Sequence, residues 1–300
     1  MSSSATGVGM PICFLGAILL ILTQKSSQKF GDVLGIMVNY NNSQLSCNCC
    51  DSLLKQQQNA NLTIIVVDNN SKQEEKEILK SYLQGKKLVE GLYLNDNIGY
   101  FPAMAKGQEL AYSKGIEYDY MIVANNDLIY EDDFLKVLSE QKFEKDVMVV
   151  SPDIIRMDGI HQNPHFINRI SPMRKYLYRF YYSNWYVALF LAWILNTFNI
   201  RRHEINKKGF DKEQYIYMGF GACFILTQAY MKQVKMLDVR SFLMGEEQLL
   251  TIQLEKVGGK TLYKPVLKVN HMDSATFKKM PSRFAYDCEC KSYQLYKDNL

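Results

Sequence analysis

Short apolar runs, each followed by polar residues, alternate with longer amphipathic segments between residues 32 and 150. Apolar runs of this kind, bounded by turn-forming residues, are typical of strands buried on both faces of a sheet. The pattern predicts strands at 33–38, 62–67, 88–94, 120–124 and 147–150. Helices are predicted between them at 72–83 and 103–114, and after Ser43, which can cap the helix that follows it.

Strands that alternate with helices predict an α/β fold, in which right-handed crossovers connect a mostly parallel central sheet with flanking helices. Polar clusters follow three of these strands, at Asn39–Asn42, Asp68–Ser71 and Asn125–Asp127. Open α/β sheets bind their ligands at the carboxyl ends of the strands. We therefore expect the three clusters to face one crevice.

The composition favours a folded globular chain. Of the 300 residues, 47% are hydrophobic and 22% are charged, which supports a hydrophobic core and argues against disorder. The formal net charge of +4 is too small to indicate a nucleic-acid partner.

The cysteines number seven, an odd count without a disulfide framework, so we expect free thiols in a reducing, cytoplasmic environment. The cluster Cys47, Cys49 and Cys50 falls on a predicted helix. We interpret it as a set of buried or surface thiols rather than as a zinc site.

Two largely apolar segments suggest contact with a membrane. Residues 1–30 form an apolar N-terminal extension, whose apolar run 11–23 is shorter than the roughly 20 residues of a membrane span. An anchor and a loose extension both remain open for this segment. If it inserts, Lys25 and Lys29 behind it would keep the rest of the chain on the cytoplasmic side.

The second segment, 180–200, is rich in aromatic residues and carries no charge. Basic residues flank it on both sides, at Arg174, Lys175, Arg179, Arg201 and Arg202. This composition is typical of an element that lies in the headgroup layer of a membrane. The alternative is a buried helix pair within an insertion at about 174–202.

Two common nucleotide-binding motifs are missing. The chain has no GxxxxGKS or GxxxxGKT sequence, which argues against a P-loop kinase or ATPase. Gly219 and Gly221 begin a dinucleotide-binding motif, but no third glycine follows and the pair comes late in the chain. A dehydrogenase is therefore not supported.

What remains is a pair of carboxylates, Asp68 and Asp127, at neighbouring strand ends. One can accept hydrogen bonds from a base or ribose, and the other can hold Mg²⁺ or Mn²⁺ against phosphates. For Asp127 alone, a helix N-cap is the simpler interpretation. The neighbouring polar clusters favour the cation.

Several motifs, taken in order, resemble the inverting family 2 glycosyltransferases of GT-A fold. They are IMVNYN, VVDNNS, NDNIGY and VANNDLIY between Gly35 and about Leu138, followed by MGFGACFILT, FLMGEEQLL and VNHMDS. Each motif is weak, whereas their order and spacing are fairly specific and cover most of residues 32–275. The greatest similarity is to rhamnosyltransferase-like members that build bacterial surface polysaccharides.

The resemblance implies a role for individual positions. Nucleotide-binding residues would be Asn39, Asp68, Asn70, Asn97, Gly99 and Asn125; metal ligands would be Asp127 and His271; catalytic residues would be Glu247, as the base, and Glu246. The implied cofactor is a divalent cation, Mg²⁺ or Mn²⁺. Asn125 replaces the first acid of the family's metal-binding triplet, which lowers the charge of the site. Glu247 stands where the family usually has aspartate, and the basic residue that usually follows is replaced by Gln253 or shifted to Lys256.

The resemblance also implies a function and a division of the chain. The enzyme would be a metal-dependent, inverting hexosyltransferase that moves a sugar from a dTDP- or UDP-sugar to a glycan or polyprenyl-linked acceptor. Residues 31–150 would form the nucleotide-sugar half, 151–275 the acceptor and catalytic half, and 276–300 a C-terminal tail. The protein would be cytoplasmic and peripheral at the inner face of the cell membrane. A sugar-nucleotide nucleotidyltransferase and a non-catalytic glycan-binding relative are the alternatives.

Overall fold

The computed structural model describes residues 31–197, 208–272 and 282–300. The N-terminal extension at 1–30, the flanking Arg201 and Arg202, and the first part of the tail lie outside the described residues.

The strands are β1 (Asp32–Asn39), β2 (Asn61–Asp68), β3 (Val89–Tyr93), β4 (Tyr120–Asn125), β5 (Leu128–Tyr130), β6 (Val147–Arg156), β7 (Gln214–Ile216), β8 (Cys223–Thr227) and β9 (Lys260–His271). The α-helices are α2 (Ser43–Leu54), α3 (Gln73–Leu83), α4 (Tyr100–Ser113), α5 (Phe134–Ser139), α6 (Pro172–Tyr181), α7 (Trp185–Thr197), α8 (Gln228–Gln233), α9 (Glu246–Lys256) and α10 (Arg283–Tyr296). Short 3₁₀ turns occur at η1 (Gln57–Asn59) and η2 (Lys297–Asn299).

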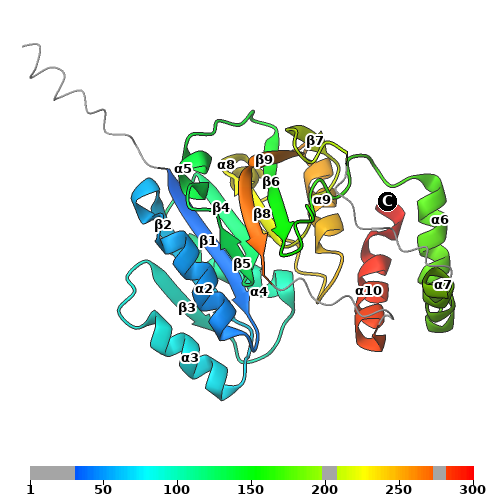
Figure 1. The fold of residues 1–300 in the computed structure, drawn as a ribbon, viewed down its shortest axis with the longest axis horizontal. Coiled ribbons are helices and arrows are strands. Elements are labelled where there is room, and N and C mark those ends of the chain that lie inside the picture. The colour runs from blue at the N-terminus through cyan, green and yellow to red at the C-terminus, as the bar shows by residue number, and fades with distance from the viewer. Residues whose placement is uncertain (1–30, 198–207, 273–281) are drawn as a thin grey trace, which may run out of the picture. The chain divides into compact units, whose positions relative to one another are not determined.

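These strands form one sheet in the order β3-β2-β1-β4-β8-β6-β9-β5, with β7 paired to β9 (Figure 1). β1 is parallel to β2 and β4, and β2 is parallel to β3, as the alternating pattern predicts. β8 enters antiparallel between β4 and β6, so the second half of the sheet is mixed. The predicted α/β fold with flanking helices is confirmed, with parallel pairing concentrated in its first half.

Helices cover both faces of the sheet because β1 is apolar on both sides. Val33 and Met37 pack toward α2, α3 and α5, whereas Leu34, Ile36 and Val38 pack toward α4, α8 and α9. This is the arrangement that a continuous apolar run predicts for a buried parallel strand.

The cysteines of α2 belong to the first of these cores. Cys49 and Cys50 are fully buried, and the described cysteines are free thiols. Burial raises the pKa of both thiols, so they remain protonated. The interpretation of this cluster as packed thiols rather than a zinc site is thereby supported.

Element boundaries differ from the pattern at two places that matter for the site. Helix α4 begins at Tyr100, three residues before its apolar periodicity, because Gly99 turns the chain with φ 99°. Strand β6 continues beyond Val150 to Arg156 across a register shift at Pro152, where it pairs with β9.

The aromatic insertion forms the helices α6 and α7, which lie beside α10 at one end of the sheet (Figure 1). The described part of the C-terminal tail is mostly helical, and α10 packs through Tyr293 and Tyr296 on Leu249 and Ile252 of α9. Among the described residues, no helix combines the length and apolar character needed to cross a bilayer.

Candidate functional site

A cleft of about 460 Å³ opens at the carboxyl ends of β1, β2 and β4. Its walls come from the three predicted polar clusters, from the start of α4, from the loop before α9 and from α10. The lining residues are Val38, Tyr40, Asn42, Asn69, Asn97, Gly99, Tyr100, Asn125, Asn126, Asp127, Phe242, Leu243 and Phe284. The predicted crevice is therefore present at this edge of the sheet.

Asn39 and Asp68 are fully buried and do not line this cleft. The Asn39 amide donates to Asp68 Oδ2 at 2.9 Å, and the backbone N–H of Ser71 donates to Asp68 Oδ1 at 3.0 Å. Both side chains are thus occupied in joining the tips of β1 and β2. The structure places them under the cleft, where they hold the strand ends together.

The neighbouring Asn69, rather than Asn70, reaches the cleft. Its amide nitrogen donates to Asn97 Oδ1 at 2.9 Å and to the Gly99 carbonyl at 3.0 Å. Asn70 adopts a left-handed φ of 64° and accepts a hydrogen bond from Lys76 at the exposed surface. Of the predicted residues in this region, Asn97 and Gly99 line the cleft and Asn70 does not.

Gly99 allows two segments of the cleft wall to touch. A Cβ atom at this position would lie 2.3 Å from the carbonyl oxygen of Phe242. The N–H of Tyr100 donates to that same oxygen at 2.8 Å. A side chain at Gly99 would push away the loop that leads into α9.

The triplet Asn125–Asp127 lies at the end of β4, and hydrogen bonds with two different helices fix its first two side chains. Tyr100 donates its hydroxyl hydrogen to Asn125 Oδ1, and Asn126 donates to Ser46 Oγ at 2.8 Å. Burial raises the pKa of the Tyr100 hydroxyl, which therefore stays neutral. The negative charges of Glu246, Asp127 and Glu247 add to this rise in the pKa of Tyr100.

Asp127 and His271 form a pair. Strand pairing sets Leu128 opposite His271, and Asp127 Oδ2 lies 3.1 Å from His271 Nε2. The other ring nitrogen, Nδ1, lies 2.7 Å from Gln162 Oε1. Asp127 Oδ1 is buried without a hydrogen-bond partner among the described residues.

This pair fits a divalent cation. Two neighbouring ligands of an octahedral ion, each about 2.1 Å from it, lie about 3.0 Å apart. The unpaired Asp127 oxygen offers a further ligand atom, and the contact with Gln162 orients the His271 ring as outer-shell partners of metal ligands do. No group of three His, Cys, Asp or Glu side chains in the described ranges is arranged as a closed site. A cation here would take its remaining ligands from phosphate and water, which is usual for Mg²⁺.

Glu246 and Glu247 begin α9 after Gly245, which has a left-handed φ of 81°. Glu247 Oε1 accepts a hydrogen bond from the Gly221 N–H at 3.2 Å. Burial raises the pKa of Glu247. Burial, together with the charge of Glu247, raises the pKa of Glu246 to about 7.

Several residues of the site escaped the sequence pattern. Tyr100 sits at a helix start, and Gln162 lies in an irregular loop far from His271 in sequence. Gly221 was visible as part of a GxG, but its close approach to Glu247 was not: a Cβ there would lie 2.3 Å from Glu247 Oε1. Phe242 lies in the loop before α9 and Phe284 near the start of α10, both outside the polar clusters from which the crevice was predicted.

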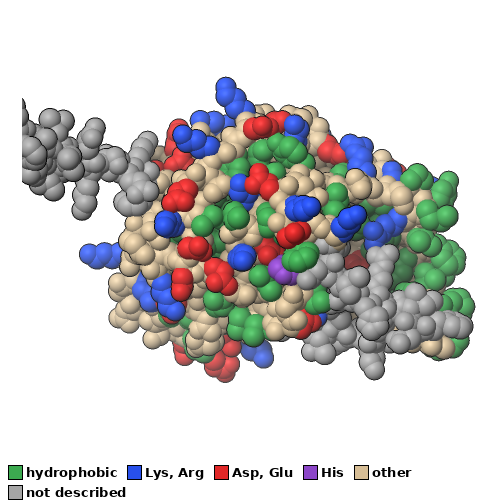
Figure 2. Space-filling view, turned by 45° about the horizontal axis from the view of Figure 1, so that its top comes forward, with side chains coloured by type: hydrophobic (Ala, Val, Ile, Leu, Met, Phe, Trp, Pro, Cys, Tyr) green, Lys and Arg blue, Asp and Glu red, His purple; other side chains and the backbone are tan. Residues whose placement is uncertain are grey.

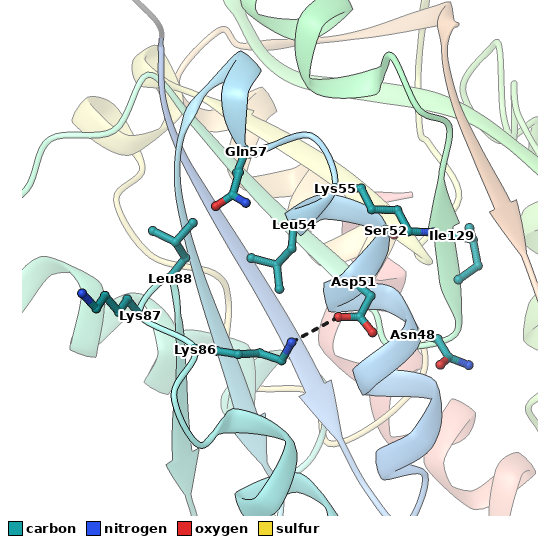
Figure 3. A pocket seen from close by; sticks show the side chains of 10 residues that line it. All are labelled: Asn48, Asp51, Ser52, Leu54, Lys55, Gln57, Lys86, Lys87, Leu88 and Ile129. Atoms are coloured by element: carbon teal, nitrogen blue, oxygen red, sulfur yellow. Dashed lines mark hydrogen bonds and ion pairs between the residues drawn. The ribbon is translucent and has the colours of Figure 1, made fainter.

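A second depression of about 710 Å³ lies between α2 and the segment before β3, and Figure 3 shows its lining side chains. Lys86 faces Asp51 across it at 3.5 Å, whereas Lys87 points away. None of the predicted site residues lines this depression. The cleft at the strand ends is therefore the candidate site.

Comparison with known proteins places the fold. Residues 36–208, more than half of the chain, match the protein-family model described as Glycosyl transferase family 2. No curated protein matches the chain.

Three solved structures are similar. GalNAc-T7 with UDP, GalNAc and Mn²⁺ is 16% identical with a TM-score of 0.54, over 81% of this chain and 44% of that one. TarS 1–349 of S. aureus is 14% identical with a TM-score of 0.52, over 81% and 60%. The mannosyltransferase PcManGT from Pyrobaculum calidifontis, in complex with GDP-Man and Mn²⁺, is 13% identical with a TM-score of 0.50, over 90% and 67%. At these identities the likeness establishes the GT-A-like fold alone, and the chain spans less than two thirds of the first two structures.

Proposed function

This chain belongs to glycosyl transferase family 2, and we propose that it transfers a sugar from a nucleotide-sugar donor to a hydroxyl group, with inversion at the sugar carbon. One observation carries the proposal. Asp127, His271 and Glu247 come from distant segments. Asp127 lines the cleft and lies 3.1 Å from His271, and Glu247 is at the start of α9, directly after the loop whose Phe242 and Leu243 line the same cleft. A donor diphosphate and a catalytic carboxylate can therefore meet in one place.

The donor occupies the side of the cleft formed by β1, β2 and the start of α4. Asn97 and Asn125 line it with amide groups, and Gly99 with backbone. The Tyr100 hydroxyl donates to the side-chain oxygen Oδ1 of Asn125. The side-chain nitrogen Nδ2 of Asn125 can therefore donate a hydrogen bond to the nucleotide-sugar. Asn39 and Asp68 act from below by fixing the strand tips. The donor is a dTDP- or UDP-sugar.

Asp127 and His271 would hold a divalent cation, Mg²⁺ or Mn²⁺. When bound, the cation neutralises the negative charge that builds on the departing diphosphate. Gln162 orients His271 so that Nε2 points toward Asp127. Asn125 stands where the family's metal-binding triplet has its first acid, so the side chains of this site carry less negative charge. A diphosphate would therefore supply more of the negative charge around a cation.

Glu247 is the base. Its carboxylate takes the proton of the acceptor hydroxyl, whose oxygen bonds to the anomeric carbon while the bond from that carbon to the diphosphate breaks. Positioned bases of this kind contribute about 10²–10⁴-fold to the rate. The Gly221 N–H fixes one carboxylate oxygen, and burial raises the pKa of Glu247 toward the neutral range in which a base works best. Inversion follows from a single displacement, which needs no second carboxylate as nucleophile.

The transferred sugar is a hexose of the rhamnose type, and the acceptor is a glycan on a lipid carrier, in the synthesis of a surface polysaccharide. Phe242, Leu243 and Phe284 make one wall of the cleft apolar. An apolar wall suits the methyl group of a 6-deoxyhexose. We also propose a division into a nucleotide-sugar half, 31–150, and a catalytic half, 151–275, because Asn97 and Asn125 of the cleft come from the first half and Glu247 on α9 comes from the second.

A thermal-shift screen of nucleoside diphosphates, with and without Mn²⁺, tests the proposal. We expect stabilisation by dTDP or UDP that depends on Mn²⁺, followed by release of free nucleoside diphosphate when nucleotide-sugar and acceptor are both present. Release of pyrophosphate from a nucleoside triphosphate and a sugar phosphate would instead indicate a nucleotidyltransferase. No Mn²⁺-dependent stabilisation by any nucleoside diphosphate would reject the proposal.

A further inference from the structure

We propose that α6 and α7 bind the surface of an anionic phospholipid membrane through a face that the other described residues leave uncovered. We call this face the α6–α7 surface and define it by the exposed side chains of Tyr176, Phe180, Tyr186, Phe190 and Trp193. Figure 2 shows hydrophobic side chains gathered at this end of the molecule, with basic ones next to them.

The composition of α7 does not match its exposure. The helix has the sequence WYVALFLAWILNT, and Ala188 alone of its thirteen described residues is buried. Tyr186 is 76% exposed, and Phe190 and Trp193 are more than half exposed, with their rings stacked at 6.0 Å. A helix that is apolar on all sides is normally enclosed. Exposed apolar area of this kind marks a surface that contacts a protein or a membrane.

The inner side of the helix pair is already occupied. The ring of Tyr182 stacks on Tyr293 of α10 at 4.6 Å, and Trp185 meets Tyr286 of α10 at 5.0 Å. The Tyr286 hydroxyl also donates to the backbone carbonyl of Tyr181 at 3.2 Å. These contacts fix the pair against the enzyme and leave the α6–α7 surface outward.

Charge selects an anionic membrane as the occupant. Residues 159–203 contain no Asp or Glu, while Arg174, Lys175 and Arg179 lie on α6. Arg174 lies over the Phe166 ring at 4.7 Å, so its cation stays next to aromatic groups. The acidic residues of the neighbouring α10 are engaged: Asp287 pairs with Arg283 at 3.0 Å, and Glu289 accepts from Tyr182.

Aromatic residues beside cations have the composition of the headgroup layer. Each basic residue near an anionic surface adds about 1 kcal/mol, or about fivefold, to binding. A membrane that carries anionic lipid therefore fits this surface better than a neutral one.

The helix lengths indicate binding along the membrane surface. At about 1.5 Å per residue, the thirteen described residues of α7 reach about 20 Å, short of the roughly 30 Å hydrocarbon core. Helix α6 is amphipathic and carries its basic residues beside the exposed Tyr176 and Phe180, and helices of this kind lie in the interface with their apolar face about 5–10 Å into the lipid.

Docking in this way would orient the cleft. Helix α10 contacts α6 and α7 on one side and α9 on the other, and its Phe284 lines the cleft. Ser292 of α10 also donates to the Leu243 carbonyl at 3.2 Å, next to the start of α9. The membrane would lie beside the wall formed by Phe242, Leu243 and Phe284, next to the helix α9 that carries Glu247, where a lipid-linked acceptor could enter. This last step rests on the proposed function, whereas lipid binding does not.

Tryptophan fluorescence of the whole chain tests the inference locally. The chain has two tryptophans, and both belong to α7. Trp185→Phe therefore leaves Trp193 as the only reporter. With vesicles of phosphatidylglycerol and phosphatidylcholine, we expect its emission to shift to shorter wavelength and to be quenched by lipids brominated on their acyl chains. Unchanged emission in a sample that sediments with the vesicles would overturn the inference, because binding would then occur elsewhere.

Cosedimentation of variants with vesicles measures how much each side chain contributes to membrane binding. Phe190→Glu combined with Trp193→Glu is expected to lower the vesicle partition coefficient at least tenfold. Ile78→Glu on α3 is the matched control, because Ile78 is 44% exposed and lies on a helix remote from α7, and it should bind as wild type does. Arg179→Gln should weaken binding to anionic vesicles about fivefold and leave binding to phosphatidylcholine alone unchanged.

Two further readouts separate the possible failures. Mn²⁺-dependent stabilisation by a nucleoside diphosphate should persist in the double variant, which shows an intact cleft whatever happens at the membrane. Sedimentation velocity without lipid tests for self-association. Wild-type dimers that the double variant abolishes, together with no vesicle binding, would overturn the inference and assign the surface to a second copy of the chain.

Discussion

The substitution Gly221→Ala tests the position of the proposed base without altering any carboxylate. Gly221 has no left-handed φ, so alanine brings no backbone strain there. Its Cβ, however, would lie 2.3 Å from Glu247 Oε1 and 2.8 Å from Cδ, where ordinary contacts begin at 3.4 Å. The carboxylate must therefore retreat by about 1 Å. A displacement of that size at a reacting group costs on the order of 10²-fold in rate.

Two quantities separate this effect from general damage. The kcat, measured as release of nucleoside diphosphate at saturating donor, should fall about 10²-fold, while the Kd of the nucleoside diphosphate with Mn²⁺ should stay unchanged in calorimetry. Gly31→Ala is the matched control, because its Cβ would meet nothing closer than 3.4 Å, and it should keep wild-type kcat. Adding Glu247→Asp to Gly221→Ala shortens the side chain by one methylene and should recover part of the loss. A Gly221→Ala enzyme with wild-type kcat would refute the reasoning.

Further predictions concern the cation and the buried acid. Asp127→Ala should abolish the Mn²⁺-dependent part of nucleoside diphosphate binding, measured by calorimetry, and unchanged Mn²⁺ dependence would remove Asp127 as a ligand. Gln162→Leu should weaken Mn²⁺ binding about 10–100-fold through loss of the hydrogen bond to His271, as titration of bound Mn²⁺ by paramagnetic resonance would show. Glu246→Gln should raise the stability of the fold above that of wild type, and this gain should be larger at pH 8 than at pH 5. Folding raises the pKa of Glu246 from 4.5 to about 7. Below pH 4.5 the carboxyl group is protonated in both states and does not reduce the free energy of unfolding. Between pH 4.5 and 7 that free energy falls, by about 3 kcal/mol in total, because only the unfolded state loses the proton readily, and glutamine avoids this cost. A difference in Tm between variant and wild type that is the same at both pH values would contradict the assigned burial.

The first half of the fold could be predicted because its signals are local. The apolar runs at β1, β2 and β4 are buried on both faces, and each ends in the polar residues that mark the edge of the sheet. The second half could not, because β8 inserts antiparallel between β4 and β6 through a pairing between segments about 75 to 105 residues apart. No periodicity within a short window carries that information.

The site divides in the same way. The polar cluster after β4 pointed to Asp127, whereas His271 and Glu247 were implied by the resemblance alone. In the structure Asp127 and His271 contact each other, and Glu247 accepts a hydrogen bond from the Gly221 N–H. Asn39 and Asp68 were expected to touch the nucleotide, but at the strand ends their polar groups bind each other. A residue next to a cleft can serve its floor or its lining, and only the contacts of its side chain distinguish the two.

The most direct test of the account is the kinetics of Glu247→Gln with nucleotide-sugar, acceptor and Mn²⁺. Glutamine keeps the size of the side chain and its contact with the Gly221 N–H but cannot take a proton. We predict a loss of about 10²–10⁴-fold in kcat with nucleoside diphosphate affinity unchanged. Near wild-type turnover in this variant would contradict the account.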